Sequence, residues 1–165
     1  MDAVTPDRIR NVALVGHGSA GKTTLAEALL FEAKAINRRG RVEDGNTVCD
    51  FDAEEQAHRL SLSLALAPFE WKGHKVNLID TPGYADFVGD VAAALRVVDL
   101  AVFVVSAVEG VEVQTEAIWK MAAALGVPRM IFINKLDRER ASFPRVLEQL
   151  RDRFGAGIAP LELPI

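Results

Sequence analysis

The first residues of chemical interest form a glycine-rich run that ends in a lysine and a threonine. Residues 16–23 read G-H-G-S-A-G-K-T, which matches the phosphate-loop pattern G-x-x-x-x-G-K-S/T. Glycines let successive backbone N–H groups converge on one anion, and a helix that begins here adds partial positive charge. Lys22 would then reach the β- and γ-phosphates of a nucleotide, and the Thr23 hydroxyl would bind Mg²⁺.

A glycine-rich turn between a strand and a helix is the structural alternative for this run. Its four fixed positions match by chance on the order of once in 30,000 windows, so the phosphate-loop interpretation is favoured. The residues that would contact the nucleotide here lie in one stretch: His17, Gly18, Ser19, Ala20, Gly21, Lys22, Thr23 and Thr24.

A second motif indicates which base is bound. Asn134, Lys135 and Asp137 form N-K-x-D directly after the apolar run 130–133. The Asp137 carboxylate can accept hydrogen bonds from the ring N–H and the exocyclic amine of guanine, whereas adenine would leave it desolvated and unpaired. Asn134 can bridge the base and the phosphate loop, and the Lys135 stem can lie on the base plane. Taken alone, the motif is as consistent with a polar loop as with a guanine site. Its position at the end of a predicted strand, downstream of the phosphate loop, favours the guanine site.

A third motif, D-T-P-G at residues 80–83, follows the apolar run 76–79. Asp80 would hold Mg²⁺ through a water molecule, and Gly83 would offer its backbone N–H to the γ-phosphate. That bond exists with GTP and is lost with GDP, so the segment would act as a switch. Alone it is typical of a Pro-Gly turn; its place between the other motifs assigns Thr81 and Pro82 to the nucleotide site as well.

Strand-like and helix-like segments alternate along the chain and would position these motifs. Short apolar runs predict buried strands at 11–15, 100–105 and 130–133. Two further strands are predicted over 60–71 and 75–79, joined by the turn 72–74 as an antiparallel hairpin. Helical periodicity predicts helices over 22–34, 86–98, 113–125 and 143–154.

In the first helix, the predicted buried face carries Leu25, Ala28, Leu29 and Ala33, and the polar segment 38–48 after it is typical of a loop. The alternation predicts an α/β fold with a mostly parallel sheet and one antiparallel strand, with helices on both faces. Ligands of such sheets bind beyond the carboxyl ends of the strands, where all three motifs lie.

Composition narrows the class of protein. The chain has 165 residues, of which half are apolar and a quarter charged, as in one ordinary globular domain. The formal net charge of −4 argues against autonomous nucleic-acid binding. Cys49 is the single cysteine, which rules out an internal disulfide and fits a reducing cytoplasm. We see no signal peptide and no membrane-spanning run, and we expect a cytoplasmic monomer.

Beyond the motifs, several stretches resemble translation factors of the elongation factor G type, especially the divergent second elongation-factor-G-like proteins of bacteria. These stretches are 76–88, Gly110-Val111 with Gln114, 127–129, 134–138 and 161–165. The resemblance implies a P-loop NTPase G domain that binds GTP and GDP with Mg²⁺ and hydrolyses GTP to drive a conformational switch on the ribosome. It also implies that the 165 residues are a single partial G domain of a longer factor, because the family's final strand and Ser-Ala-x guanine loop are not found.

The resemblance assigns catalytic positions to Lys22, Gly83 and Tyr84, and metal positions to Thr23, Ser61 and Asp80. Three departures stand out. Tyr84 replaces the histidine that helps to position the attacking water in the family. The switch I signature aligns with residues 58–61, where only the Ser61 hydroxyl keeps the ability to reach Mg²⁺. Ser19 stands where these factors commonly have aspartate.

These departures leave nucleotide binding intact and predict slow hydrolysis, so two functions stay open at this stage. One is a translational GTPase, and the other is a guanine-nucleotide sensor on the ribosome with little hydrolysis. A ribosomal protection protein of the tetracycline-resistance type is a further alternative, since these proteins are similar to elongation factor G. An ATP-dependent function is disfavoured by Asp137. The polar segment 38–58 is expected to become ordered only with a bound triphosphate.

Overall fold

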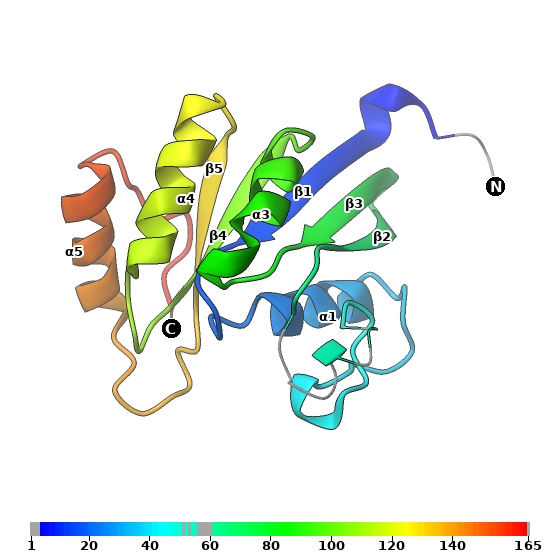
Figure 1. Ribbon diagram of the computed structural model, residues 1–165, viewed down its shortest axis with the longest axis horizontal. Coiled ribbons are helices and arrows are strands. Elements are labelled where there is room, and N and C mark those ends of the chain that lie inside the picture. The colour runs from blue at the N-terminus through cyan, green and yellow to red at the C-terminus, as the bar shows by residue number, and fades with distance from the viewer. Residues whose placement is uncertain (1–3, 51, 53, 56–60, 165) are drawn as a thin grey trace.

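A computed structural model describes residues 4–50, 52, 54–55 and 61–164 of the chain (Figure 1). Within these residues, five strands form one sheet in the order β2-β3-β1-β4-β5. Their bounds are β1 (Ile9–Val15), β2 (Ala65–Trp71), β3 (His74–Asp80), β4 (Leu100–Ser106) and β5 (Arg129–Asn134). Strands β2 and β3 pair antiparallel and all other pairs are parallel, which confirms the predicted sheet and its hairpin.

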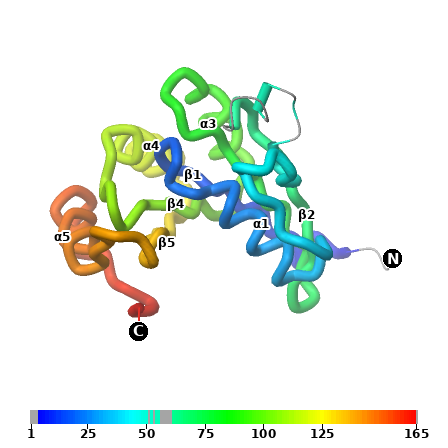
Figure 2. The backbone as a smooth tube through the Cα atoms, turned by 90° about the horizontal axis from the view of Figure 1, so that it is seen from below, coloured from blue at the N-terminus to red at the C-terminus, as the bar shows by residue number. Residues whose placement is uncertain are grey.

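Helices cover both faces of this sheet. They are α1 (Lys22–Glu32), α3 (Val88–Leu95), α4 (Val113–Ala124) and α5 (Phe143–Phe154), with short 3-10 turns η1 (Pro6–Arg8), η2 (Val42–Asp44) and η3 (Ala85–Phe87). Figure 2 shows α3 and α4 above the strands and α1 below them. Among the described residues, no helix has the length and apolar character that a bilayer span requires.

Successive β4 side chains alternate between the two layers, as strand geometry requires. Phe103 lies in the core beneath α3 and α4, whereas Val102 packs into the core beneath α1. A third cluster joins β4 and β5 to α5 through Val105, Val146 and Leu150. The Trp119 ring of α4 stacks on Phe154 of α5 with ring centroids 4.2 Å apart, so these two helices support each other.

Helix α1 buries a different face from the predicted one. Its buried residues are Lys22, Thr23, Ala26, Glu27 and Leu30, whereas Leu29 of the predicted face is 36% exposed. The prediction was wrong because the phosphate loop orients the helix: Lys22 and Thr23 must face inward, and the period of 3.6 residues then brings 26, 27 and 30 to the same side.

Other boundaries also differ from the predictions. Within the described residues, strand β5 lies at the edge of the sheet: Met130 and Phe132 are 41% and 38% exposed, while Ile131 and Ile133 pack toward α5. The helix predicted over 86–98 starts later, at Val88 after η3, and ends at Leu95. The strand predicted over 60–71 begins at Ala65, and residue 60 lies outside the described residues.

The carboxyl end of α1 closes in a Schellman motif without the usual glycine. The backbone N–H of Ala35 donates to the Leu30 carbonyl and that of Lys34 to the Phe31 carbonyl, each at 2.9 Å. Lys34 therefore adopts a left-handed conformation with φ of 59°. A side chain at such a position costs about 1 kcal/mol relative to glycine.

Replacing Lys34 by glycine is expected to raise the free energy of unfolding by about 0.5–1 kcal/mol, because glycine adopts this conformation without a steric cost. Lys34→Ala removes the same charge but keeps the Cβ atom, so it serves as the control and should give no gain. Denaturant unfolding of the two variants measures the difference. An equal gain in both would assign the effect to charge and not to the backbone.

Candidate functional site

The three motifs meet around one cavity of about 600 Å³ beyond the carboxyl ends of β1, β3 and β5. Twelve of the predicted site residues line it: Gly18, Ser19, Gly21, Lys22, Thr23, Thr24, Ser61, Gly83, Tyr84, Asn134, Lys135 and Asp137. The other predicted residues are buried next to these: His17, Ala20, Asp80, Thr81 and Pro82. The structure thus brings the predicted residues into a single region, although the segment 58–60 of the predicted switch I signature lies outside the described residues.

The phosphate loop curls around the Lys22 ammonium. Lys22 Nζ donates to the carbonyl oxygens of Gly16 and His17, at 3.2 and 2.9 Å. Ser19 and Gly21 take up left-handed conformations that turn the chain into α1. Burial lowers the pKa of Lys22 to about 8, against the opposing effect of the carboxylates of Asp80 and Asp50. At neutral pH the ammonium is still mostly charged, as phosphate binding requires.

Three residues predicted to hold a metal form a hydrogen-bonded cluster. Thr23 Oγ1 donates to Asp80 Oδ2 at 2.7 Å and lies 3.1 Å from Ser61 Oγ. Ser61 Oγ in turn donates to Asp50 Oδ1 at 2.7 Å. These four side chains come from α1, the end of β3 and the long connection between α1 and β2. Asp50 lines the cavity and is 3% exposed, and the sequence motifs did not identify it.

The donor set of this cluster fits Mg²⁺. Asp80 is 2% exposed, and its Oδ1 atom has no hydrogen-bond partner within the described part of the chain. Burial raises the pKa of Asp80 to about 6, although the Thr23 hydroxyl and Lys22 act in the opposite direction. The described ranges contain no cluster of three or more acidic, histidine or cysteine side chains arranged for a metal. Mg²⁺ in nucleotide sites is held by one or two protein oxygens together with phosphates, and this arrangement provides such oxygens.

The D-T-P-G segment lies directly on the phosphate loop. The Thr81 hydroxyl donates to the Leu14 carbonyl at 2.7 Å, which fixes the segment to β1. A Cβ atom on Gly83 would lie 2.6 Å from the Gly18 nitrogen and closer still to Lys22 Nζ, so only glycine fits. The next residue, Tyr84, is 41% exposed at the cavity. Its ring is so close to Gly18 that a Cβ there would lie 3.0 Å from Tyr84 Cζ.

The N-K-x-D segment contacts the phosphate loop from the other side. Asn134 Nδ2 donates to the Ala20 carbonyl at 2.9 Å. Lys135 has a left-handed backbone, and its Nζ lies 3.8 Å from the Glu109 carboxylate. The Asp137 side chain is 78% exposed and lies 3.7 Å from Arg138 Nε. Its carboxylate is therefore accessible to a base that enters the cavity.

Two further side chains near the phosphate loop are buried, which the sequence motifs did not indicate. His17, predicted as part of the loop that contacts the nucleotide, is 9% exposed, and neither ring nitrogen has a partner among the described residues. Burial, followed by the Lys22 charge, lowers the pKa of His17. Glu27 of α1 is 1% exposed. Its spacing of four residues from Thr23 is the signal that could have identified it as inward-facing.

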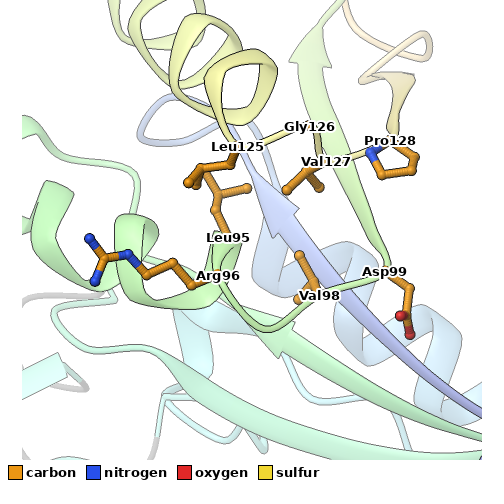
Figure 3. A pocket seen from close by; sticks show the side chains of 8 residues that line it. All are labelled: Leu95, Arg96, Val98, Asp99, Leu125, Gly126, Val127 and Pro128. Atoms are coloured by element: carbon orange, nitrogen blue, oxygen red, sulfur yellow. The ribbon is translucent and has the colours of Figure 1, made fainter.

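A second cavity, of about 420 Å³, lies at the opposite ends of the strands (Figure 3). It is lined by Leu95, Arg96, Val98, Asp99, Leu125, Gly126, Val127 and Pro128. The Asp99 carboxylate there accepts a hydrogen bond from the Asn11 backbone at 2.7 Å. None of the three motifs reaches this cavity, and ligands of α/β sheets bind at the carboxyl ends of strands, so we do not assign the nucleotide to it.

Comparisons with known proteins show what the chain is similar to. Residues 7–162 match the family model described as elongation factor Tu GTP binding domain. An elongation factor G-like protein of Mycobacterium tuberculosis (strain H37Rv) is 49% identical over 159 residues, which cover 96% of this chain and 22% of that protein. Elongation factor G of Dehalococcoides mccartyi (strain CBDB1) is 41% identical over 159 residues, which cover 96% and 23%.

A solved structure is similar as well. A crystal structure of a protein from Thermus thermophilus superposes with a TM-score of 0.86 at 48% identity, and the match covers 90% of this chain and 22% of that one. The chain therefore spans about a fifth of the length of the relatives it matches.

The raised pKa of Asp80 predicts a specific pH dependence of stability. Its folded pKa of about 6 exceeds the ordinary value of 3.8, so between these pH values the native state binds more protons than the unfolded state. The ionised carboxylate therefore destabilises the fold, fully above pH 6 and not at all below about pH 4. We expect Asp80 to lower the free energy of unfolding by roughly 2–3 kcal/mol as pH rises from 4 to 7.

The Asp80→Asn variant should lack this part of the pH dependence, because the amide does not titrate. Denaturant unfolding between pH 4 and 7, without nucleotide or Mg²⁺, gives the two profiles. Parallel profiles for the wild type and the variant would show that Asp80 keeps an ordinary pKa.

Proposed function

The chain belongs to the elongation factor Tu GTP binding domain family, and from that premise we propose that it binds GTP and GDP with Mg²⁺ in an elongation factor G-like translational GTPase. GTP hydrolysis in this domain drives a conformational switch of the whole factor on the ribosome. The observation that carries the proposal is the convergence of the phosphate loop, D-T-P-G and N-K-L-D on one cavity. The ribosome is proposed as the partner of the longer factor, in keeping with the name of a further relative, ribosome-releasing factor 2 of Debaryomyces hansenii.

The phosphates are assigned to the loop around Lys22. Its ammonium, which now donates to carbonyls of the loop, would turn to the β- and γ-phosphates. The Gly83 N–H, next to Gly18, would donate to the γ-phosphate and join the switch segment to the loop. Thr23, Ser61 and Asp80 would hold Mg²⁺, directly or through water. The ion would offset the charge of the phosphates during phosphoryl transfer.

The base is assigned to the exposed carboxylate of Asp137. Asn134 supports this position because its amide is already bonded to the phosphate loop, which fixes the distance between base and phosphates. The Lys135 stem, half-enclosed beside Glu109, would lie along the base.

We further propose that hydrolysis is slow, because of Tyr84. A phenol is a weaker proton acceptor than the imidazole of a histidine, so it activates an attacking water less well. The ring lies over Gly18 and not in the core, so it is close enough to the phosphates to affect an attacking water. This residue also supports the second candidate function, a guanine-nucleotide sensor whose GTP state persists with little turnover.

Guanine specificity is tested by Asp137→Asn. The amide can donate to a ring carbonyl, so the variant should prefer xanthine nucleotides and lose most of its affinity for GTP. Calorimetric titration with GTP, ATP and XTP measures the preference, and Lys22→Ala, which removes the charge of the phosphate loop, should bind none of them tightly. Equal affinity of the wild-type protein for ATP and GTP would contradict the assignment of the base.

The role of Tyr84 is tested by Tyr84→His in the intact factor with ribosomes. If a water-positioning contact is missing, the histidine should raise GTP turnover by up to about a hundredfold, which corresponds to one hydrogen bond in a dry site. Tyr84→Phe is the control, because it removes only the hydroxyl. Unchanged or reduced turnover in Tyr84→His would mean that Tyr84 or another residue already positions the water.

A further inference from the structure

Helix α1 carries a carboxylate that the nucleotide chemistry does not use. Glu27 is 1% exposed, in the middle of the helix. Its two oxygens accept hydrogen bonds from two separate backbone amides: Oε2 from Gly40 at 2.7 Å and Oε1 from Val48 at 2.5 Å. A buried charge is costly without such partners, so this arrangement is a built contact between the helix and the connection that follows it.

The two amides mark the two ends of one closed loop. The backbone of Gly40 lies against that of Asn46 and Thr47, so close that a Cβ on Gly40 would be 2.5 Å from the Asn46 carbonyl oxygen. Inside the loop, the Arg41 N–H donates to Asn46 Oδ1 at 2.7 Å. Glu27 therefore holds loop 40–48 at its base, where the chain enters and leaves it. These contacts are all made within the chain, so residues 40–48 are held without a triphosphate, which differs from the expectation from the sequence for segment 38–58.

The loop leads directly into the proposed Mg²⁺ cluster. The residue after Val48 is Cys49, which packs in the core beneath α1 and is 3% exposed. The next residue, Asp50, accepts hydrogen bonds from Thr47 Oγ1 at 3.1 Å and from Ser61 Oγ at 2.7 Å. Ser61 lies 3.1 Å from Thr23. The position of Val48 thus determines that of Asp50, and through it the position of Ser61.

We propose that Glu27 is a positioning residue: its carboxylate clamps loop 40–48 to α1 and thereby holds Asp50 and Ser61 beside Thr23. The clamp is inferred from contacts within the chain alone, whereas its effect on nucleotide affinity rests on the proposed function. A carboxylate is needed because both oxygens must accept hydrogen bonds. A glutamine would place its NH₂ group against one of the two N–H donors.

The single cysteine of the chain provides a reporter of the clamp. Cys49 is adjacent to Val48, and burial raises the pKa of its thiol, so the closed loop protects it from thiol reagents. In the intact protein without nucleotide, Glu27→Gln should increase the labelling rate of Cys49 by about tenfold, because a buried unsatisfied donor favours local opening. The rate is read on the peptide that contains Cys49, at a temperature well below the unfolding transition.

The matched control is Glu32→Gln, which makes the same change of charge at an exposed position of α1. It should leave the labelling rate unchanged. Equal rates in Glu27→Gln and the wild type would overturn the clamp. If Glu27→Gln does not fold, hydrogen exchange of the wild-type protein decides: the amides of Gly40 and Val48 should exchange more slowly than that of the exposed Glu43 in the same loop. Equally fast exchange of all three would overturn the proposal.

The effect on the nucleotide is measured separately. In Mg²⁺, Glu27→Gln should reduce the ratio of GTP to GDP affinity by about tenfold, since Ser61 reaches the metal only with the triphosphate, and Glu32→Gln should keep the wild-type ratio. An unchanged ratio together with faster Cys49 labelling would show that the clamp does not position the Mg²⁺ cluster, which overturns that step. Absence of GTP binding by the wild-type protein would instead reject the proposed function and leave the labelling result to judge the clamp.

Discussion

The hydrogen bond of 2.7 Å from the Thr23 hydroxyl to Asp80 is the contact on which the geometry of the site depends. It joins the first turn of α1 to the end of β3, and the sheet register makes it possible. Strands β1 and β3 are parallel neighbours with Leu14 opposite Asp80, so the phosphate loop and the D-T-P-G segment begin side by side at the carboxyl ends of these strands. The hydrogen bond from the Thr81 hydroxyl to the Leu14 carbonyl holds the ends of the two strands together.

This arrangement concentrates charge where water is excluded. Four charged side chains are buried here: Lys22, Asp80, Asp50 and Glu27. The pKa of Lys22 is lowered and that of Asp80 is raised, so both shifts favour the neutral form of the side chain. Asp80 Oδ1, which has no hydrogen-bond partner among the described residues, adds to this cost. A ligand that brings a metal ion and phosphates would satisfy these groups. The domain thus keeps at its binding site a set of contacts that weakens the isolated fold, as functional sites commonly do.

Much of this could be predicted from the sequence, because the information is local. Glycine spacing identified the phosphate loop, and apolar runs identified the strands. The errors concern facts that depend on distant contacts. The inward face of α1 follows from the orientation of Lys22 and not from its apolar residues. Asp50 and Glu27 belong to no motif; only the fold brings them to the cluster and to loop 40–48.

The most direct test of the Thr23–Asp80–Ser61 cluster is the Mg²⁺ dependence of GTP dissociation in the wild type and in Thr23→Val, which keeps the shape of the side chain but removes its hydroxyl. If the cluster holds Mg²⁺, chelation of the ion should speed GTP release from the wild type by about tenfold or more, and should have little further effect on the variant, whose release is already fast. Equal acceleration in both proteins would show that Mg²⁺ is bound without Thr23 and would contradict the assignment of this site.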